Sequence, residues 1–175
     1  MAIKKLGRRT FLKSASFAAA AAAATGGGVV IGPNGAWALA LSKLDAATGK
    51  TLIRMARDLY PHDQFDDAPY AKVAEALDQA AAKDEALAKL LTDGAAALDK
   101  ASGGSYLKAK EERRLATLVG MQTDPFFQKV RGTVVTTLYN DPDVWKKLGY
   151  EGSSAEQGGY ISRGFDDIDW LPKQG

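Results

Sequence analysis

The feature that most constrains the fold of this chain is the recurrence of apolar side chains at helical spacing across residues 52–148. Apolar residues three or four positions apart line one face of an α-helix, whereas half-buried strands show strict alternation. Alternation is nearly absent, and the β-branched run at 133–137 continues a helical period already set by Phe127 and Val130. The apolar stripes comprise Leu52, Ile53, Ala56, Leu59 and Tyr60; Tyr70, Val73, Ala74, Leu77 and Ala81; Leu87, Leu90, Leu91, Ala95 and Leu98; Leu115, Leu118 and Val119; and Phe127, Val130, Val134 and Leu138.

The boundaries of these stripes carry residues that begin or end helices. Pro61 closes the first stripe, and Ser102-Gly103-Gly104 closes the third. Asp124-Pro125 and Asp141-Pro142 each combine a capping carboxylate with a proline suited to the first helical turn, and Asp66-Asp67-Ala68-Pro69 has a similar form. The charged run 108–114 is expected to face solvent. We therefore expect an all-α helical domain over residues 39–148, a small bundle of about five to six short helices.

Residues 1–38 have the layout of an export signal. A basic head precedes an alanine-rich apolar run, a glycine-bearing connector and the small-residue exit 36–38, with 38–40 as an alternative exit. The head resembles the twin-arginine pattern of proteins that fold before export, and its determinants are Arg8, Arg9, Phe11 and Leu12. We expect a twin-arginine signal peptide cut after Ala38, and a periplasmic protein.

The charge of the chain is unevenly distributed. The whole chain has a formal net charge of +2, but five of its 23 basic residues and none of its 21 acidic residues fall in residues 1–38. The remainder therefore holds 18 basic and 21 acidic residues, a net charge of about −3. This balance does not favour a nucleic-acid partner, which would require a clustered basic face.

Residues 149–175 form an irregular C-terminal arm that is rich in glycine and aromatic residues. The arm has six glycines in 27 residues and no helical period. It also contains Tyr150, Tyr160, Phe165 and Trp170, whose rings are expected to pack on some surface. Two interpretations stay open: the arm folds back on the helices of its own chain, or these four rings form a partner interface.

The inventory of reactive side chains is small. The chain has no cysteine, which excludes thiolate iron–sulfur ligation, covalent c-type haem attachment, a thiol nucleophile and disulfides. His62 is the single histidine, and Asp63, Asp66 and Asp67 follow it closely. These four residues suggest one alternative function, a free-standing periplasmic protein that binds a small ligand or a metal. The preferred interpretation is a turn that ends a helix, without catalytic, cofactor or metal ligands.

Five stretches of unusual composition stand out between residues 59 and 172. They read LYPHD at 59–63, DDAPYAKVAEALD at 66–78, DPFF at 124–127, YNDPDVWKKLGYEG at 139–152 and GGYISRGFDDIDWLP at 158–172. Together they resemble the gluconate 2-dehydrogenase subunit 3 family, and within it the small (gamma) subunits of bacterial FAD-dependent glucose dehydrogenases. The resemblance covers most of residues 42–172, behind the twin-arginine leader, in which Gly7 stands where Ser or Thr is usual.

The resemblance implies a non-catalytic accessory subunit without a cofactor of its own. In such complexes FAD and sugar oxidation belong to a large flavoprotein of the glucose–methanol–choline oxidoreductase type, and a multihaem cytochrome c subunit carries electrons to the membrane. The small subunit is regarded as an export escort and folding partner, so its membrane association comes only through the complex. No catalytic residue of the family carries over to this chain.

Overall fold

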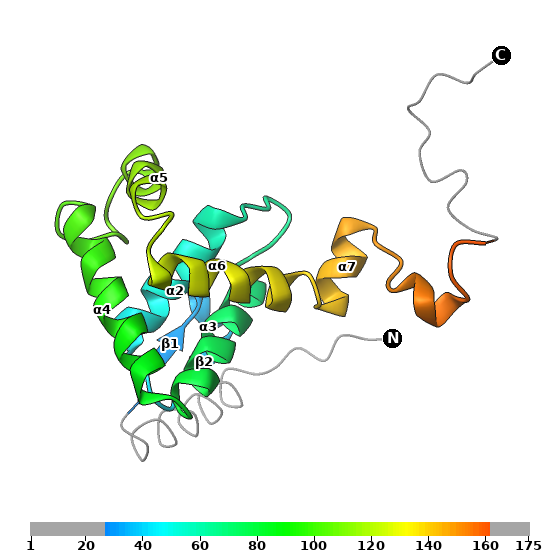
Figure 1. The fold of residues 1–175 in the computed structure, drawn as a ribbon, viewed down its shortest axis with the longest axis horizontal. Coiled ribbons are helices and arrows are strands. Elements are labelled where there is room, and N and C mark those ends of the chain that lie inside the picture. Colours follow the sequence, from blue (N-terminus) through cyan, green and yellow to red (C-terminus); the bar gives the residue numbers. More distant parts are fainter. Residues whose placement is uncertain (1–26, 162–175) are drawn as a thin grey trace. The chain divides into compact units, whose positions relative to one another are not determined.

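The computed structural model describes residues 27–161, and within this range it contains six α-helices and one two-stranded sheet (Figure 1). The predominantly α-helical fold predicted from the apolar spacing is confirmed. No helix in this range has both the length and the apolar character needed to cross a bilayer. The elements are β1 (Val29–Ile31), η1 (Pro33–Gly35), β2 (Ala38–Ala40), α2 (Ala46–Leu59), α3 (Ala68–Ala81), α4 (Glu85–Ala101), α5 (Glu111–Gly120), α6 (Pro125–Leu138), α7 (Pro142–Leu148) and η2 (Ser154–Gln157).

Side-chain caps fix where three of the helices begin. The carboxylate of Asp45 accepts the N–H of Thr48 at 2.7 Å at the start of α2, and Asp84 caps α4 in the same way. Asp124 accepts the N–H of Phe126 at 2.8 Å, with Pro125 in the first turn of α6. These bonds satisfy backbone donors that a helix leaves unpaired at its N-terminus. The predicted Asp124-Pro125 helix start is therefore confirmed.

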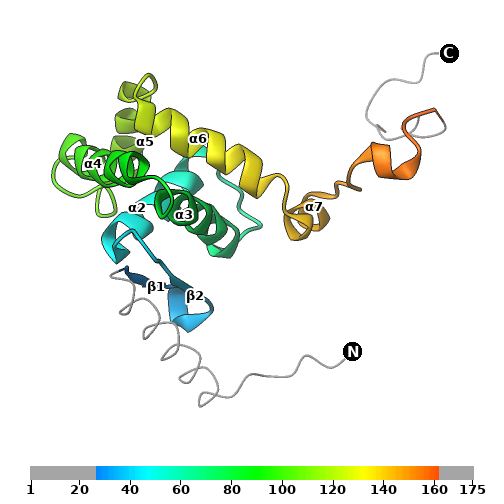
Figure 2. The same ribbon diagram turned by 60° about the horizontal axis from the view of Figure 1, so that its bottom comes forward.

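Helices α2, α3, α4 and α6 enclose the hydrophobic core of the first compact unit, which extends to Asp141. Figures 1 and 2 show α6 running across α3 and α2, with α4 along the side of the bundle. Gly94 of α4 lies against the ring of Phe126, so the absence of a side chain at this position lets α4 and α6 approach closely. The largest fully buried side chains are Leu41, Leu44, Leu52, Met55, Phe65, Tyr70, Leu77, Leu91, Leu98, Tyr106, Phe126 and Leu138.

A β-hairpin precedes the bundle. Strands β1 and β2 are antiparallel, with Val30 opposite Leu39, and both side chains are buried. Residues 29–38 lie in the segment that the sequence analysis assigned to a removable leader, yet Val30 is only 2% exposed. The rest of the expected leader, residues 1–26, lies outside the described residues.

One carboxylate of α3 fastens the turn that follows the hairpin. Asp78 accepts the backbone N–H groups of Ser42, Lys43 and Leu44 at 2.7, 2.9 and 2.8 Å, and it accepts the Ser42 hydroxyl at 2.7 Å. Burial alone would raise the pKa of Asp78, but these backbone hydrogen bonds outweigh it and lower the pKa below its ordinary value. The ionised carboxylate therefore ties the entry of α2 to α3.

The second compact unit begins at Pro142 and is described here up to residue 161. Helix α7 belongs to this unit, although the sequence analysis grouped residues 142–148 with the helical domain. Beyond α7, Gly149, Gly152, Gly158 and Gly159 all have positive φ, a backbone conformation that favours glycine. The helix predicted after Asp141-Pro142 is present, and irregular chain with the short η2 follows it.

Candidate functional site

Of the residues predicted for the export signal and the partner interface, two fall within the described range. The export-signal residues Arg8, Arg9, Phe11 and Leu12 precede it, and Phe165 and Trp170 of the predicted partner interface follow it. Tyr150 and Tyr160 are described, and both belong to the second unit.

Tyr150 is anchored to Trp145 and partly exposed. Its ring meets the ring of Trp145 edge to face, with centroids 5.5 Å apart, and its N–H donates to the Trp145 carbonyl at 2.9 Å. About half of the Tyr150 surface nevertheless stays open to solvent, since its exposed fraction is 49%. The ring is thus held against Trp145 of α7, and the exposed part of Tyr150 is available for a further contact.

Tyr160 and Ile161 are the most exposed large apolar residues in the described part of the second unit, residues 142–161. Their exposed fractions are 62% and 89%, and Gly158 and Gly159 directly precede them. We refer to Tyr150, Tyr160 and Ile161 as the arm residues. Neighbouring exposed apolar side chains such as Tyr160 and Ile161 are typical of surfaces that associate with another protein.

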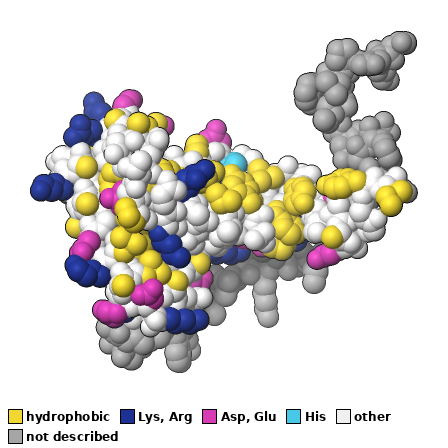
Figure 3. All heavy atoms as spheres, viewed as in Figure 1, with side chains coloured by type: hydrophobic (Ala, Val, Ile, Leu, Met, Phe, Trp, Pro, Cys, Tyr) yellow, Lys and Arg dark blue, Asp and Glu magenta, His cyan; other side chains and the backbone are white. Residues whose placement is uncertain are grey.

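His62 and its neighbouring aspartates make contacts within the first unit. The His62 Nε2 atom lies 2.9 Å from the Tyr139 hydroxyl, and its ring packs on Phe65 with centroids 4.8 Å apart. Figure 3 shows the chain's one histidine beside hydrophobic side chains on this face. Asp66 accepts the N–H of Ala68 at 3.1 Å, and Asp67 pairs with Arg57 at 3.0 Å. Within residues 27–161 no three His, Cys, Asp or Glu side chains are grouped so as to hold a metal ion.

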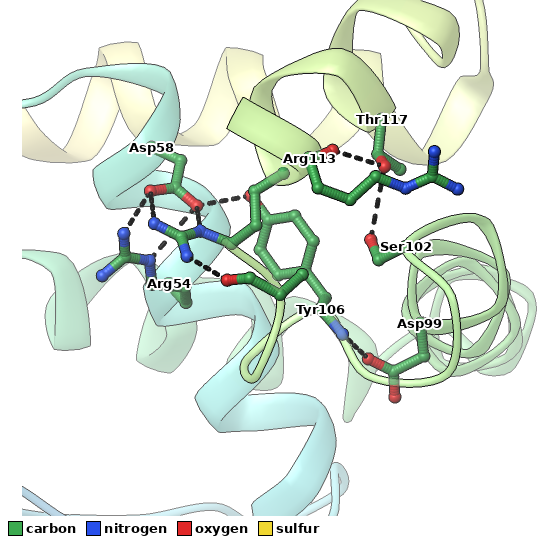
Figure 4. Close-up of polar contacts among 9 residues, drawn as sticks. Arg54, Asp58, Asp99, Ser102, Tyr106, Arg113 and Thr117 are labelled. Atoms are coloured by element: carbon green, nitrogen blue, oxygen red, sulfur yellow. Dashed lines mark hydrogen bonds and ion pairs between the residues drawn. The ribbon is translucent and has the colours of Figure 1, made fainter. Parts of the chain in front are cut away.

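Three groups with shifted pKa values, Asp58, Tyr106 and Arg114, lie together near the end of α2 (Figure 4). The Asp58 carboxylate accepts the Tyr106 hydroxyl at 2.6 Å and the Arg114 Nε–H at 2.8 Å, and Arg54 pairs with its other oxygen at 2.7 Å. We call Arg54, Asp58, Tyr106 and Arg114 the Asp58 network. It joins α2, the 102–110 connection and α5.

Burial and mutual pairing set the charges of this network. Burial would raise the pKa of Asp58, but hydrogen bonds from Arg114, Tyr106 and Arg54 outweigh it and lower that pKa. Burial raises the pKa of Tyr106, and its hydrogen bond to the ionised Asp58 raises it further. Asp58 is therefore ionised and Tyr106 neutral near neutral pH, and each is oriented by the other. The expectation that residues 108–114 face solvent is wrong for Arg114, which is 7% exposed because it reaches Asp58.

A groove adjoins the network on the side of the hairpin. It consists of two cavities of about 240 and 350 Å³ that share Pro33, Trp37, Arg54 and Asp67 as lining residues. The Trp37 ring packs over Gly32, where a Cβ atom would lie 2.4 Å from the indole. Arg54 thus connects the two features, since it pairs with Asp58 and also lines the groove. An indole and a guanidinium group that line the same groove are suited to binding polar or aromatic groups.

Sequence reasoning did not find the Asp58 network or the groove. The network joins residues 48 and 56 positions apart, and a single sequence does not reveal such pairings. One signal was available for the groove: the β-branched run Val29-Val30-Ile31 is typical of a strand, and it stands a few residues before Trp37.

Comparison of this chain with protein-family models, with curated proteins and with solved structures finds no match.

Proposed function

We propose that this protein is the non-catalytic small subunit of a periplasmic FAD-dependent sugar (glucose) dehydrogenase complex. In this proposal it escorts the flavin-bearing large subunit through export and stabilises its fold. The proposal draws on the twin-arginine pattern at Arg8 and Arg9, on the family resemblance of residues 59–172, and on the surface of the arm.

The observation that carries the proposal is the exposure of the arm residues. Tyr150, Tyr160 and Ile161 leave 49%, 62% and 89% of their surfaces open in the chain alone. Burying such a side chain at an interface contributes about 1.5–3 kcal/mol before the costs of ordering and association. Several rings at the centre of one interface are therefore sufficient anchors for a stable complex.

The buried polar groups of the described residues have roles in the fold that fit a supporting subunit. Asp78 holds the start of α2, and the Asp58 network holds the 102–110 connection and α5. The proposal accordingly assigns FAD and sugar oxidation to the large flavoprotein partner. A shared export signal then explains the twin-arginine leader, because a flavoprotein that binds its cofactor before export must cross the membrane folded.

The test of docking is co-purification from the native host with a matched pair of variants. The test variant Tyr160→Asp places a charge on the arm, and the control Val119→Asp changes a side chain of α5 with a similar exposed fraction, 65% against 62%. We expect the parent and the control to elute with a flavoprotein that shows a flavin absorbance spectrum, and the test variant to lose it. A monodisperse chain that never carries a flavoprotein in its own compartment would refute the proposal.

The test of escort is the location of the large subunit. Replacing Arg8-Arg9 by Lys-Lys should retain both proteins in the cytoplasm, because one signal serves the pair. The measurement is flavin-dependent dehydrogenase activity in separated periplasmic and cytoplasmic fractions. Active large subunit in the periplasm of the Lys-Lys strain would contradict the shared signal.

A further inference from the structure

The hairpin that follows the expected leader belongs to the core of the first unit. Val30 of β1 and Leu39 of β2 face each other in register and are 2% and 8% exposed, and Leu41 just after the hairpin is 1% exposed. Ile31, the next residue of β1, points to the opposite face and is 54% exposed. This alternation is typical of a strand with one face on a hydrophobic core.

Backbone hydrogen bonds attach the hairpin to the turn before α2, and close packing attaches it to α2 itself. The N–H of Gly28 donates to the Leu44 carbonyl at 3.0 Å, and the N–H of Leu41 donates to the Gly28 carbonyl at 2.7 Å. A Cβ atom at Gly49 of α2 would lie 2.6 Å from a Leu41 methyl group and 3.1 Å from a Val30 methyl group. The missing side chain at Gly49 therefore makes the room that these two apolar side chains occupy.

We infer that the hairpin is a permanent part of the exported protein, so that any cut releasing the leader falls upstream of Gly27 and not after Ala38. This inference rests on the proposed function in one respect, namely that the chain is folded when it is exported. A peptidase binds its substrate as extended, unpaired chain. The bond between Ala38 and Leu39 lies inside β2, where Ala38 pairs with Ile31 and the Leu39 side chain is buried.

The products of the two possible cuts differ sharply. Hydrolysis after Ala38 adds water across that peptide bond, leaves a carboxylate on Ala38 and makes Leu39 the new ammonium terminus. The cut would also remove Val30 from the core and Trp37 from the groove. Hydrolysis upstream of Gly27 leaves both in place. The sequence offers a small-residue exit of the same form there, Ala22-Ala23-Ala24.

The direct test is N-terminal sequencing and intact mass of the protein recovered from the periplasm. We expect a terminus at or upstream of Gly27, including the case of an uncut leader. A periplasmic protein that begins at Leu39 or Leu41 would overturn the inference.

A matched pair of full-chain variants gives a second, independent readout. Val30→Ala should lower the Tm of the periplasmic protein by at least about 5 °C, because it removes two methyl groups from the core and leaves a cavity. Ile31→Ala, one residue along on the exposed face, should leave Tm nearly unchanged. If residues 1–38 are removed, neither substitution remains in the mature protein, and equal Tm values for both would contradict the inference.

Failure of the proposed function has a different signature from failure of this inference. A chain that stays in the cytoplasm defeats the export proposal, yet Val30→Ala and Ile31→Ala still report whether the hairpin stabilises the full chain. Unequal Tm values then support the hairpin as part of the fold, and equal values refute it.

Discussion

Replacing Gly94 by alanine should destabilise this protein, although alanine is the better helix former. A Cβ atom built on Gly94 would lie 2.2 Å from Cγ, 2.3 Å from Cδ2 and 2.7 Å from Cβ of Phe126. Carbon atoms in favourable contact are about 3.5–4.0 Å apart, so the shortest of these distances must grow by roughly 1.3 Å. The clash falls at the base of the ring and on Cβ itself, and rotating the ring does not relieve it. Helices α4 and α6 must therefore separate.

The magnitude follows from two opposing contributions. Overpacking a well-packed core costs about 1–3 kcal/mol, and the fully buried position of Phe126 places this change near the upper end. The helix propensity of alanine returns about 1 kcal/mol. We expect a net loss of about 2 kcal/mol in the free energy of unfolding and a Tm lower by about 4–8 °C.

The matched control is Gly132→Ala in the middle of α6. A Cβ atom there would meet no atom within 4 Å, so only the propensity gain of about 1 kcal/mol remains and the variant should be more stable than the parent. Urea unfolding followed by far-ultraviolet circular dichroism measures both changes. A Gly94→Ala variant at least as stable as the parent would refute the packing argument.

Three further predictions concern the buried charges. Asp58→Asn should cost about 3–5 kcal/mol of unfolding free energy, because it removes the charge that compensates buried Arg114. The control Asp93→Asn, in an exposed pair with Lys89, should cost no more than about 0.5 kcal/mol. Equal losses of the two variants in urea titration would contradict this prediction. Tyr106→Phe should lower the unfolding free energy by about 1.5–3 kcal/mol, since a hydrogen bond to the charged Asp58 is lost while the ring remains; an unchanged urea midpoint would count against the bond. The folded protein holds the pKa values of Asp58 and Asp78 below those of the unfolded chain. At pH values between the folded and the unfolded pKa the unfolded state therefore binds more protons, and stability falls as pH drops below about 4. Tm measured against pH should fall less steeply for Asp78→Asn than for the parent, and parallel curves would exclude the contribution of Asp78.

Local signals account for the part of the fold that could be predicted from the sequence. Helix α6 begins where Asp124-Pro125 indicated, and the β-branched run 133–137 lies inside it because Phe127 and Val130 set the helical period. Helix α2 ends at Leu59, before Pro61. In each case the responsible groups lie within a few residues of one another, so the chain carries the information locally.

Long-range pairings account for most of what could not be predicted. Arg114 stands in a charged run that is otherwise typical of a solvated surface, and it is buried because it pairs with the distant Asp58. The hairpin was assigned to the leader because the glycines around Val29–Ile31 are equally typical of a signal connector. Its two strands have three residues each, too short to show a clear alternation.

The anchor of the turn at 42–44 has a consequence for the order of events during synthesis. The amides of Ser42, Lys43 and Leu44 precede their acceptor, Asp78, by 36, 35 and 34 positions. They emerge from the ribosome well before the carboxylate that binds them exists as part of α3. The turn at 42–44 can therefore be secured only after α3 has been made, and its docking reports that α3 has been completed.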